Sequence, residues 1–159
     1  MYKTNFDQDG YPCPPLLEPL TLSELECRHV QEHPNSTTRA SIFTGYLEYL
    51  EDFQSAIGVG FKQWVNGSFT TQKLDPDDVD IISFVPHTVI TNSAQFTAFQ
   101  TNGGSRDRYR VDAYLIPVYP AHTIEYMTVT LLIANAWAGD FGFDRETGQE
   151  KNVAQLLFP

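Results

Sequence analysis

The sequence predicts one α/β or α+β domain that spans residues 1–159. Residues 37–57 have the periodicity of an amphipathic helix, while residues 61–65 and 109–118 are rich in the aromatic and β-branched residues of strands. The chain is 42% hydrophobic and 13% aromatic, which provides enough apolar material for one hydrophobic core. Helical and strand patterns that alternate around one core are typical of a sheet covered by helices.

The first third of the chain begins with an extended segment. Residues 1–18 are rich in proline and polar residues, so we expect an arm that covers an edge of the domain. Residues 20–26 predict a short helix in which Thr21 is the N-cap and Glu24, three positions later, completes a capping box. The sequence His-Pro-Asn at residues 33–35 ends this region.

The strongest helical pattern covers residues 37–57, and Gly58 ends it. Its apolar residues recur at intervals of three and four: Ile42, Phe43, Tyr46, Leu47, Leu50, Phe53 and Ile57. The strand predicted at residues 61–65 follows and leads directly into Gly67 and Ser68. A glycine at a strand end lets the backbone turn and lets a ligand approach closely. If a short helix starts at Ser68, its hydroxyl and the free N–H groups that follow form a small anion site.

Two aspartates begin the next apolar run. After a loop over residues 73–77, Asp78 and Asp80 flank Val79 and precede the apolar residues 81–85. Alternate residues of a strand share one face, so we expect both carboxylates to point the same way. Such acids repel each other unless a hard cation lies between them, and Mg²⁺ prefers oxygen ligands. The competing interpretation is a solvated acidic turn.

The second half of the chain adds a third strand and a third acid. Pro86 ends the acidic strand, residues 91–100 predict a helix, and the sequence Asn-Gly-Gly at residues 102–104 breaks it. Residues 109–118 predict a strand with Asp112 near its start. Tyr114 shares the face of Asp112, where it could stack on a base, although a core position is the commoner case for tyrosine in a strand.

The C-terminal region fits two kinds of secondary structure. The β-branched residues of 124–137 fit a strand, but the length and the spacing of its apolar residues favour a helix, which we predict. Residues 141–148 predict a turn, and residues 153–158 a closing strand.

The ordered set of Gly67-Ser68, a short gap and Asp78-Val79-Asp80-Ile81 resembles the nucleotidyltransferase fold of the DNA polymerase β superfamily. The string from Gly67 to Asp80 and the leader Phe6 to Tyr11 are similar to a group of small bacterial nucleotidyltransferase-like proteins. The resemblance implies a small mixed central sheet with helices packed mainly on one side. The core would be residues 37–119, with an N-terminal extension over 1–36 and a C-terminal helix and strand over 120–159.

The same resemblance implies an activity. Asp78, Asp80 and Asp112 would be the catalytic carboxylates and the ligands of Mg²⁺ or Mn²⁺ in a two-metal phosphoryl transfer. A nucleoside monophosphate would move from a nucleoside triphosphate, with ATP the expected donor, to a hydroxyl of a protein or a small molecule.

The expected nucleotide-binding residues are Gly67, Ser68, Thr70 and Lys73, with Gly67 and Ser68 on the β- and γ-phosphates. The alternative is a catalytically weak or inactive binding module, such as an antitoxin-like partner of another protein or a nucleotide sensor.

Charge limits the partners further. Twenty acids against ten lysines and arginines give a formal charge of −10, and the basic residues are scattered. Binding of an extended nucleic acid needs several basic residues on one face, so we expect a single nucleotide instead. No signal peptide and no membrane span is evident, and Cys13 and Cys27 do not form a C-x-x-C pair, so we expect a cytoplasmic protein with two thiols and no membrane partner.

Overall fold

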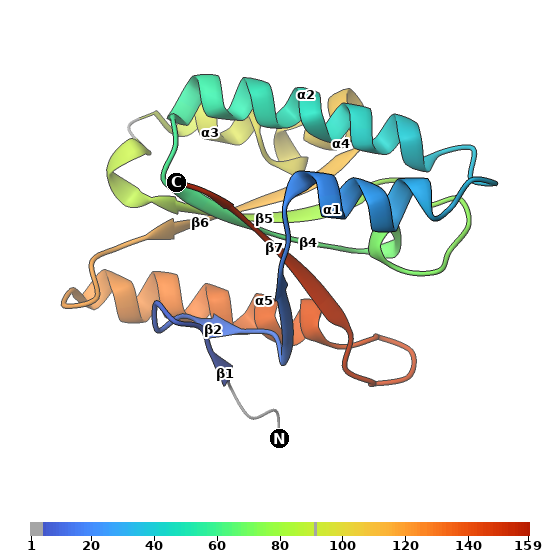
Figure 1. The fold of residues 1–159 in the computed structure, drawn as a ribbon. Helices are drawn as coiled ribbons and strands as arrows, with labels where there is room; N and C mark the ends of the chain where they lie inside the picture. Colours follow the sequence, from blue (N-terminus) through green and yellow to red (C-terminus); the bar gives the residue numbers. More distant parts are fainter. Residues whose placement is uncertain (1–4, 91) are drawn as a thin grey trace.

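A computed structural model describes residues 5–90 and 92–159, and its centre is a five-stranded mixed sheet (Figure 1). The strand order is β3-β7-β4-β5-β6. β4 runs antiparallel to both of its neighbours, whereas β3 pairs parallel with β7 and β5 pairs parallel with β6. The bounds are Leu16–Pro19 for β3, Phe61–Asn66 for β4, Val79–Pro86 for β5, Val111–Val118 for β6 and Asn152–Phe158 for β7.

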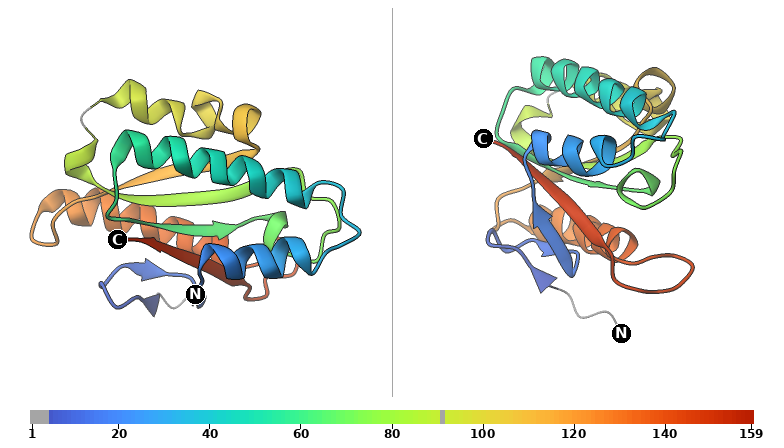
Figure 2. Two further views of the ribbon diagram at one scale, coloured as in Figure 1. Left: turned by 45° about the horizontal axis from the view of Figure 1, so that its top comes forward. Right: turned by 45° about the vertical axis from the view of Figure 1, so that its right-hand side comes forward.

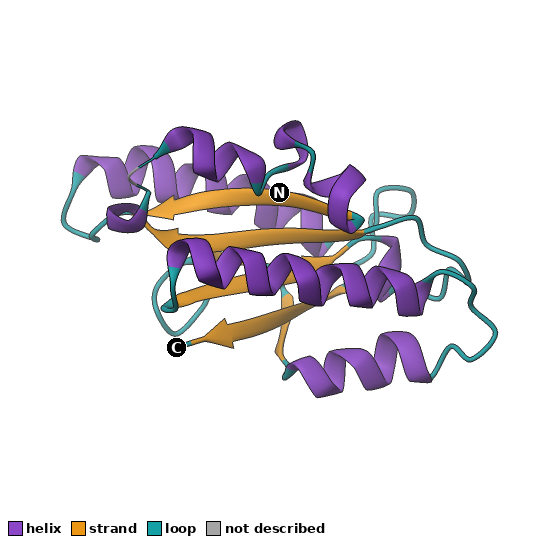
Figure 3. Ribbon diagram, turned by 90° about the horizontal axis from the view of Figure 1, so that it is seen from above, coloured by secondary structure: helices purple, strands orange, loops and turns teal. Residues whose placement is uncertain are grey.

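Helices cover both faces of this sheet (Figure 1). One face carries α1 (Leu22–Glu26) with its π-helical continuation Cys27–Gln31, α2 (Arg39–Ile57), α3 (Ser93–Ala98) and α4 (Ser105–Tyr109). α2 runs lengthwise over the strands (Figure 3), and α1 lies beside β7 (Figure 2). The other face carries α5 (Leu132–Gly142), preceded by the π-helical segment Tyr126–Leu131, and a hairpin of β1 (Asn5–Phe6) and β2 (Pro12–Cys13). The α/β prediction is confirmed. Helices were expected mainly on one side of the sheet, and α1 to α4 do lie on one face, whereas α5 lies on the other.

Alternation along β5 divides the core in two. Its odd-numbered residues Val79, Ile81 and Val85 are buried in the cluster that α2 covers. Its even-numbered residues Ile82 and Phe84 are buried with residues of α5. Since successive side chains of a strand point to opposite faces, Asp80 belongs to the α5 face. The sheet therefore determines on which side of the molecule this carboxylate lies.

The local predictions around α1 and α2 are confirmed. α2 begins two residues after the predicted start and ends at Ile57, with Gly58 as its C-cap. The Thr21 hydroxyl accepts a hydrogen bond from the Glu24 N–H at 3.2 Å, and the Glu24 carboxylate accepts one from the Thr21 N–H at 2.8 Å, which completes the predicted capping box. The N-terminal arm does cover an edge, because β3 becomes the edge strand of the sheet. Residues 1–4 of that arm and Thr91 of the predicted helix 91–100 lie outside the described residues.

Two predicted boundaries were wrong. The third strand begins at Val111 because the preceding residues form α4, a short helix that the sequence did not indicate. Tyr109, predicted as strand, ends this helix and packs edge-on against Tyr49 of α2, with ring centroids 5.6 Å apart. α5 continues to Gly142, past the predicted start of a turn at residue 141, because the absence of a side chain at Gly142 lets Pro15 of the N-terminal arm pack against it.

Two further findings complete the fold. No disulfide links Cys13 to Cys27. Within residues 5–90 and 92–159, no helix combines the length and the apolar character that crossing a bilayer requires.

Arg39 fixes the loop between the Gly-Ser turn and the acidic strand. It lies in the first turn of α2, and only 1% of its surface is exposed. Its guanidinium donates hydrogen bonds to backbone carbonyls rather than to a carboxylate: His29 at 2.9 Å, Phe69 at 2.5 Å, Thr71 at 2.7 Å, Lys73 at 2.5 Å and Leu74 at 3.3 Å. A planar group with five donors suits this role, because buried carbonyls need partners. Four of the five carbonyls belong to residues 69–74, so one side chain holds almost the whole loop.

We predict that Arg39→Met destabilises the protein by at least about 3 kcal/mol, because one buried and four partly buried carbonyls lose their donor together. Thermal unfolding should then occur roughly 6–12 °C lower. Arg28→Met is the matched control, since Arg28 is exposed and its ion pair with Glu18 lies at the surface. If urea unfolding showed that both variants lose the same unfolding free energy, the carbonyl contacts of Arg39 would contribute little to stability.

Candidate functional site

The Gly-Ser turn lies at the end of β4. Asn66 is the last residue of the strand, and Ser68–Thr70 form a single 3-10 turn, which confirms the short helix predicted from Ser68. Gly67 joins them with φ of 83° and ψ of −164°, a conformation that is essentially restricted to glycine. A Cβ atom at Gly67 would lie 1.6 Å from Oδ2 of Asp80. The turn and the second predicted acid therefore touch each other.

Asp80 and Asp112 lie side by side on adjacent strands. They are Cα partners in the parallel pairing of β5 with β6, and Asn66 is the partner of Asp80 on β4. Paired residues on neighbouring strands share a face and lie about 5 Å apart. The structure thus brings the predicted third carboxylate, Asp112, next to Asp80 on the α5 face. Asp78 precedes the first residue of β5 by one position, so it continues the line of that strand.

Asp78 has a cationic partner that the sequence did not indicate. Asp78 is 8% exposed, and its Oδ2 lies 2.6 Å from Nε of Arg106 on α4. The same oxygen is buried and has no hydrogen bond of good geometry among the described residues, so the contact is an ion pair without aligned hydrogen bonding. Arg106 was missed because α4 was missed. Its side chain is 55% exposed, which leaves it free to swing away into solvent.

Asp112 is held by a neighbouring hydroxyl. Its Oδ1 accepts a hydrogen bond from Oγ1 of Thr101, and that hydroxyl accepts one from the N–H of Ala113 at 2.9 Å. Tyr114, on the same face, packs against Trp137 of α5 with ring centroids 4.4 Å apart. Burial, followed by the charge of Asp112, raises the pKa of Tyr114. The ring of Tyr114 is therefore partly buried and packs against the core cluster under α5, close to the core position that the sequence favoured.

Asp80 is the carboxylate in the least favourable environment. Burial, followed by the charges of Asp78 and Asp112, raises its pKa to about 6, although Lys151 and Arg145 lower it in part. Burial and like charges both disfavour the ionised form of an acid. The structure consequently places at Asp80 a negative charge that a cation would stabilise.

A cavity of about 360 Å³ opens beside Asp80. It contains three of the predicted nucleotide-binding residues, Gly67, Ser68 and Lys73, whereas Asp78 and Asp112 do not line it. Its other residues come from β4, the same turn, the end of α5 and the loop before β7: Asn66, Thr71, Asp140, Phe141, Asp144, Arg145, Glu146 and Lys151. The last six of these residues were not predicted as site residues, and only four of them lie in the predicted turn at 141–148, because the fold alone brings them to Gly67.

Two predicted binding residues, Thr70 and Lys73, differ in their relation to this cavity. Thr70 does not line the cavity, and its hydroxyl contacts the Asn66 side chain and the Gly67 carbonyl, each at 3.2 Å, so its predicted role in nucleotide binding stays a prediction. Lys73 does line the cavity, with an exposed ammonium group 3.2 Å from Asp77. That surface ion pair is weak and leaves Lys73 available for a ligand.

The described residues do not form a finished metal site. Within residues 5–90 and 92–159, no group of three His, Cys, Asp or Glu side chains converges closely enough to hold a metal ion. The donor set nevertheless fits a hard cation in its chemistry, since Asp80 and Asp112 are adjacent carboxylates and Asp78 has a buried oxygen without a hydrogen bond. Completing the set requires Asp78 to exchange Arg106 for the cation.

We predict that Asp80→Asn stabilises the metal-free protein at pH 8 by about 3 kcal/mol, because a pKa raised from 3.8 to about 6 means that the ionised group opposes folding. The gain should disappear as the pH falls from 6 to below 4, where the Asp80 carboxyl is protonated in both the folded and the unfolded state. The measurement is the difference in unfolding free energy between the variant and the wild type.

Because the wild-type value is subtracted, this difference in unfolding free energy contains the effect of Asp80 and not that of His29. Burial lowers the pKa of His29 to about 4, so His29 makes the wild type and the variant alike less stable as the pH falls from 6.5. Asp77→Asn removes an exposed charge as a control. A variant that is less stable than the wild type at pH 8 would mean that Asp80 already has a compensating partner.

We predict that Gly67→Ala costs about 2 kcal/mol, because alanine is strained at this φ and ψ and its methyl group would displace the Asp80 carboxylate. Gly139→Ala in α5 is the control, since a Cβ there meets no atom within 4 Å and alanine favours a helix. In chemical denaturation, the free energy of unfolding should be lower than the wild-type value for Gly67→Ala and higher for Gly139→Ala. A neutral Gly67→Ala substitution would contradict the contact with Asp80.

Comparison with known proteins assigns a family but no activity. No curated protein and no solved structure matches the chain. One protein-family model matches residues 4–157, and its description is family of unknown function DUF6932. Because that match covers almost the whole sequence, the chain belongs to the DUF6932 family.

Proposed function

We propose that the protein is a Mg²⁺-dependent nucleotidyltransferase that transfers a nucleoside monophosphate from a nucleoside triphosphate to a hydroxyl of a protein or small molecule. The observation that carries the proposal is the direct pairing of Asp80 with Asp112 beside Gly67. A structural role does not explain this arrangement, because adjacent partly buried carboxylates repel each other and destabilise the fold.

The order of elements supports a nucleotidyltransferase fold. A long helix, α2, precedes β4, the Gly-Ser turn follows β4, and the acidic strands β5 and β6 come next and pair in parallel. This is the order of helix, strand, turn and acidic strands on which the resemblance rests. The mixed sheet is compatible with the same fold.

The cavity next to Asp80 supports a polyphosphate ligand that brings its own cation. Three cationic residues line it (Lys73, Arg145 and Lys151), and so do four acidic residues (Asp80, Asp140, Asp144 and Glu146). With three positive and four negative groups, the cavity does not attract a free triphosphate. A divalent cation shared between the acids and the phosphates reverses that balance, which is why we propose a metal-dependent activity and ATP as the donor.

Each residue then has a defined role. Asp78 and Asp80 would hold Mg²⁺ or Mn²⁺, which would supply charge neutralisation at the transferred phosphate and a more acidic acceptor hydroxyl. Gly67 and Ser68 contact the β- and γ-phosphates, with Lys73, Arg145 and Lys151 around them. Asp112, oriented by Thr101, completes the carboxylate set on the acceptor side. Arg106 would have to release Asp78 for this carboxylate to join the metal ligands.

One observation favours a second function. The ion pair between Asp78 and Arg106 neutralises one of the three carboxylates without a metal. If this pair persists when nucleotide is present, the protein is a binding module, such as a nucleotide sensor or an antitoxin-like partner of another protein. Both functions use a nucleotide or a protein partner and fit a cytoplasmic location, where nucleoside triphosphates and Mg²⁺ are available.

We predict that calorimetry detects binding of ATP in the presence of Mg²⁺ and that Asp80→Asn removes it. Asp77→Asn is the matched control, because it removes a carboxylate in the same way and Asp77 lies nearby with a side chain that is 80% exposed. Absence of binding to the wild-type protein with the metal present would refute the nucleotide-binding function in both of its forms.

Transfer itself is tested with ATP labelled at the α-phosphate and a cell lysate. The wild type should label an acceptor, and Asp80→Asn should reduce the rate at least about a hundredfold, because metal ligands contribute several kcal/mol to such transition states. Binding of ATP without any transfer would favour the binding module, and equal labelling by both proteins would exclude the metal mechanism.

A further inference from the structure

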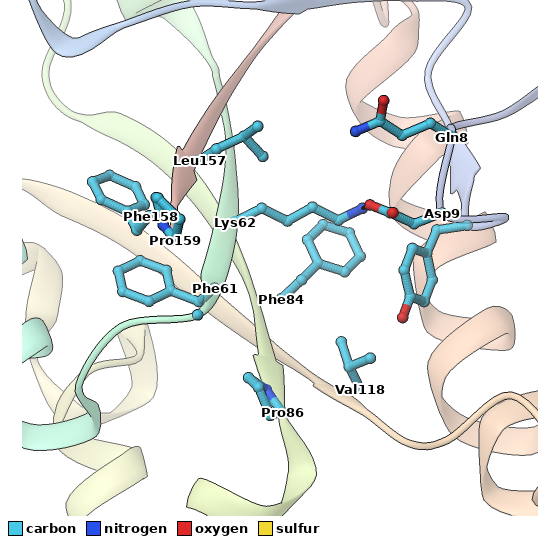
Figure 4. Close-up of a pocket in the computed structure, with 12 residues that line it drawn as sticks. Gln8, Asp9, Phe61, Lys62, Phe84, Pro86, Val118, Leu157, Phe158 and Pro159 are labelled. Atoms are coloured by element: carbon cyan, nitrogen blue, oxygen red, sulfur yellow. Dashed lines mark ion pairs between the residues drawn. The ribbon is translucent and has the colours of Figure 1, made fainter.

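Figure 4 shows a second cavity, of about 530 Å³. It lies at the Pro86 end of β5, whereas Asp80 lies near the start of that strand. It is bounded by the start of β4 at Lys62, the end of β5 at Pro86, the end of β6 at Val118 and the turn of the N-terminal hairpin. The six-residue step along β5 from Asp80 to Pro86 spans about 20 Å. The two cavities are therefore separate, and this one has no part in the proposed nucleotide site.

The hairpin wall of the cavity is fixed by Asp7. One carboxylate oxygen, Oδ1, accepts hydrogen bonds from the N–H groups of Asp9 at 3.0 Å and Tyr11 at 2.9 Å, which closes the turn. The other, Oδ2, lies 2.5 Å from Nζ of Lys62. The side chains of Asp7 and Lys62 are only 7% and 10% exposed, so they form a buried ion pair that joins the hairpin to the sheet. Such a pair is costly to break.

The charge left over in this cavity is negative. The ammonium group of Lys62 is neutralised by Asp7 and also faces the rings of Tyr11, 4.3 Å from the centroid, and Phe84, 5.4 Å from the centroid. Asp9 is the second carboxylate, and it lies 3.7 Å from the same ammonium group. Its side chain is 56% exposed. Lys62 carries one positive charge, and Asp7 and Asp9 carry one negative charge each. The net charge of the three groups is therefore −1, and the accessible carboxylate is that of Asp9.

The rest of the lining is apolar and partly aromatic. Phe84, Val118 and Leu157 form the wall on the face of the sheet that the hairpin covers, whereas Phe61 and Phe158, stacked with ring centroids 4.6 Å apart, border the cavity from the other face. In Figure 4 the side chains of Lys62 and Asp9 meet between this wall and the hairpin. Aromatic faces attract cations and accommodate flat apolar groups. Cavities of a few hundred Å³ with such a lining and a few fixed polar groups are typical of small-molecule sites.

We propose that this cavity binds an organic cation with an apolar or aromatic body, such as an aryl-alkyl ammonium. Its ammonium group lies against the Asp9 carboxylate and its apolar body lies against Tyr11, Val118 and Leu157 on the face of the sheet that carries Phe84. The buried pair of Asp7 and Lys62 holds the wall in place and does not itself bind the ligand.

The test is an NMR titration of the full chain with 2-phenylethylammonium, with 3-phenylpropionate and 2-phenylethanol as the anionic and neutral analogues. The ammonium compound should bind with a Kd on the order of 1 mM, in keeping with its small size, and should shift the amide signals of Lys62, Phe84 and Val118. The two analogues should bind more weakly. Asp9→Asn should weaken binding of the ammonium compound about tenfold, the loss expected for one exposed charge pair.

Glu51→Gln is the matched control for net charge, because Glu51 is exposed on α2, away from the cavity lining, and this variant should bind like the wild type. Tighter binding of the propionate would show that Lys62 recognises anions and would overturn the proposal. Equal binding of all three compounds, or an ammonium affinity unaffected by Asp9→Asn, would reduce the cavity to a non-specific apolar surface. No binding of any compound also contradicts it.

Discussion

The parallel pairing of β5 with β6 is the constraint on which the candidate site depends. In this register Asp80 lies beside Asp112, and both share the face of the sheet that α5 covers. A shift of one residue would send one carboxylate to the opposite face, into the apolar cluster under α2. The surrounding residues Val79, Ile81, Val111 and Ala113 are all buried in that cluster, so the hydrophobic core itself enforces the register. The core thereby holds together two charges that would otherwise separate.

Two arginines near this site, Arg39 and Arg106, have different partners and different roles. Arg39 is buried and satisfied by backbone carbonyls, so it fixes the loop from Phe69 to Leu74 and with it the distance from the Gly-Ser turn to the acids. Arg106 is half exposed and has a carboxylate partner, Asp78. The first contact is permanent, because five polar groups would lose their partners together. The second can exchange with solvent or with a cation, which makes Arg106 a natural competitor of a metal ion at Asp78.

The sequence allowed prediction of those features that short segments encode. The helix over residues 39–57, the capping box of Thr21 and Glu24, and the strand before Gly67 all rest on local periodicity or on hydrogen bonds within a few residues. Asp80 and Asp112 could be paired in advance only through the resemblance to a known fold, because their contact depends on register across two strands.

Features that depend on tertiary contacts could not be predicted. α4 is five residues long, too short to give a periodic signal, and it is stabilised by the packing of Tyr109 on α2. Arg145 and Lys151 reach the cavity only because α5 ends near Asn66, whose side chain donates a hydrogen bond to the Phe141 carbonyl at 2.5 Å. Thr70 was assigned to the ligand from its position after the Gly-Ser turn, yet its hydroxyl folds back onto Asn66. Sequence proximity to a turn does not indicate the direction of a side chain.

The central proposal, that Asp78 and Asp80 hold a divalent cation beside Gly67 with Asp112 completing the carboxylate set, is tested most directly by paramagnetic broadening with Mn²⁺. NMR spectra of the protein with ATP and substoichiometric Mn²⁺ should lose first the amide signals of Gly67, Asp80 and Asp112, while those of Lys62 and Val118 at the far end of the sheet persist. Preferential loss at Asp75 and Asp77, or uniform broadening over the acidic surface, would contradict the account and leave the paired aspartates without a cation to bind.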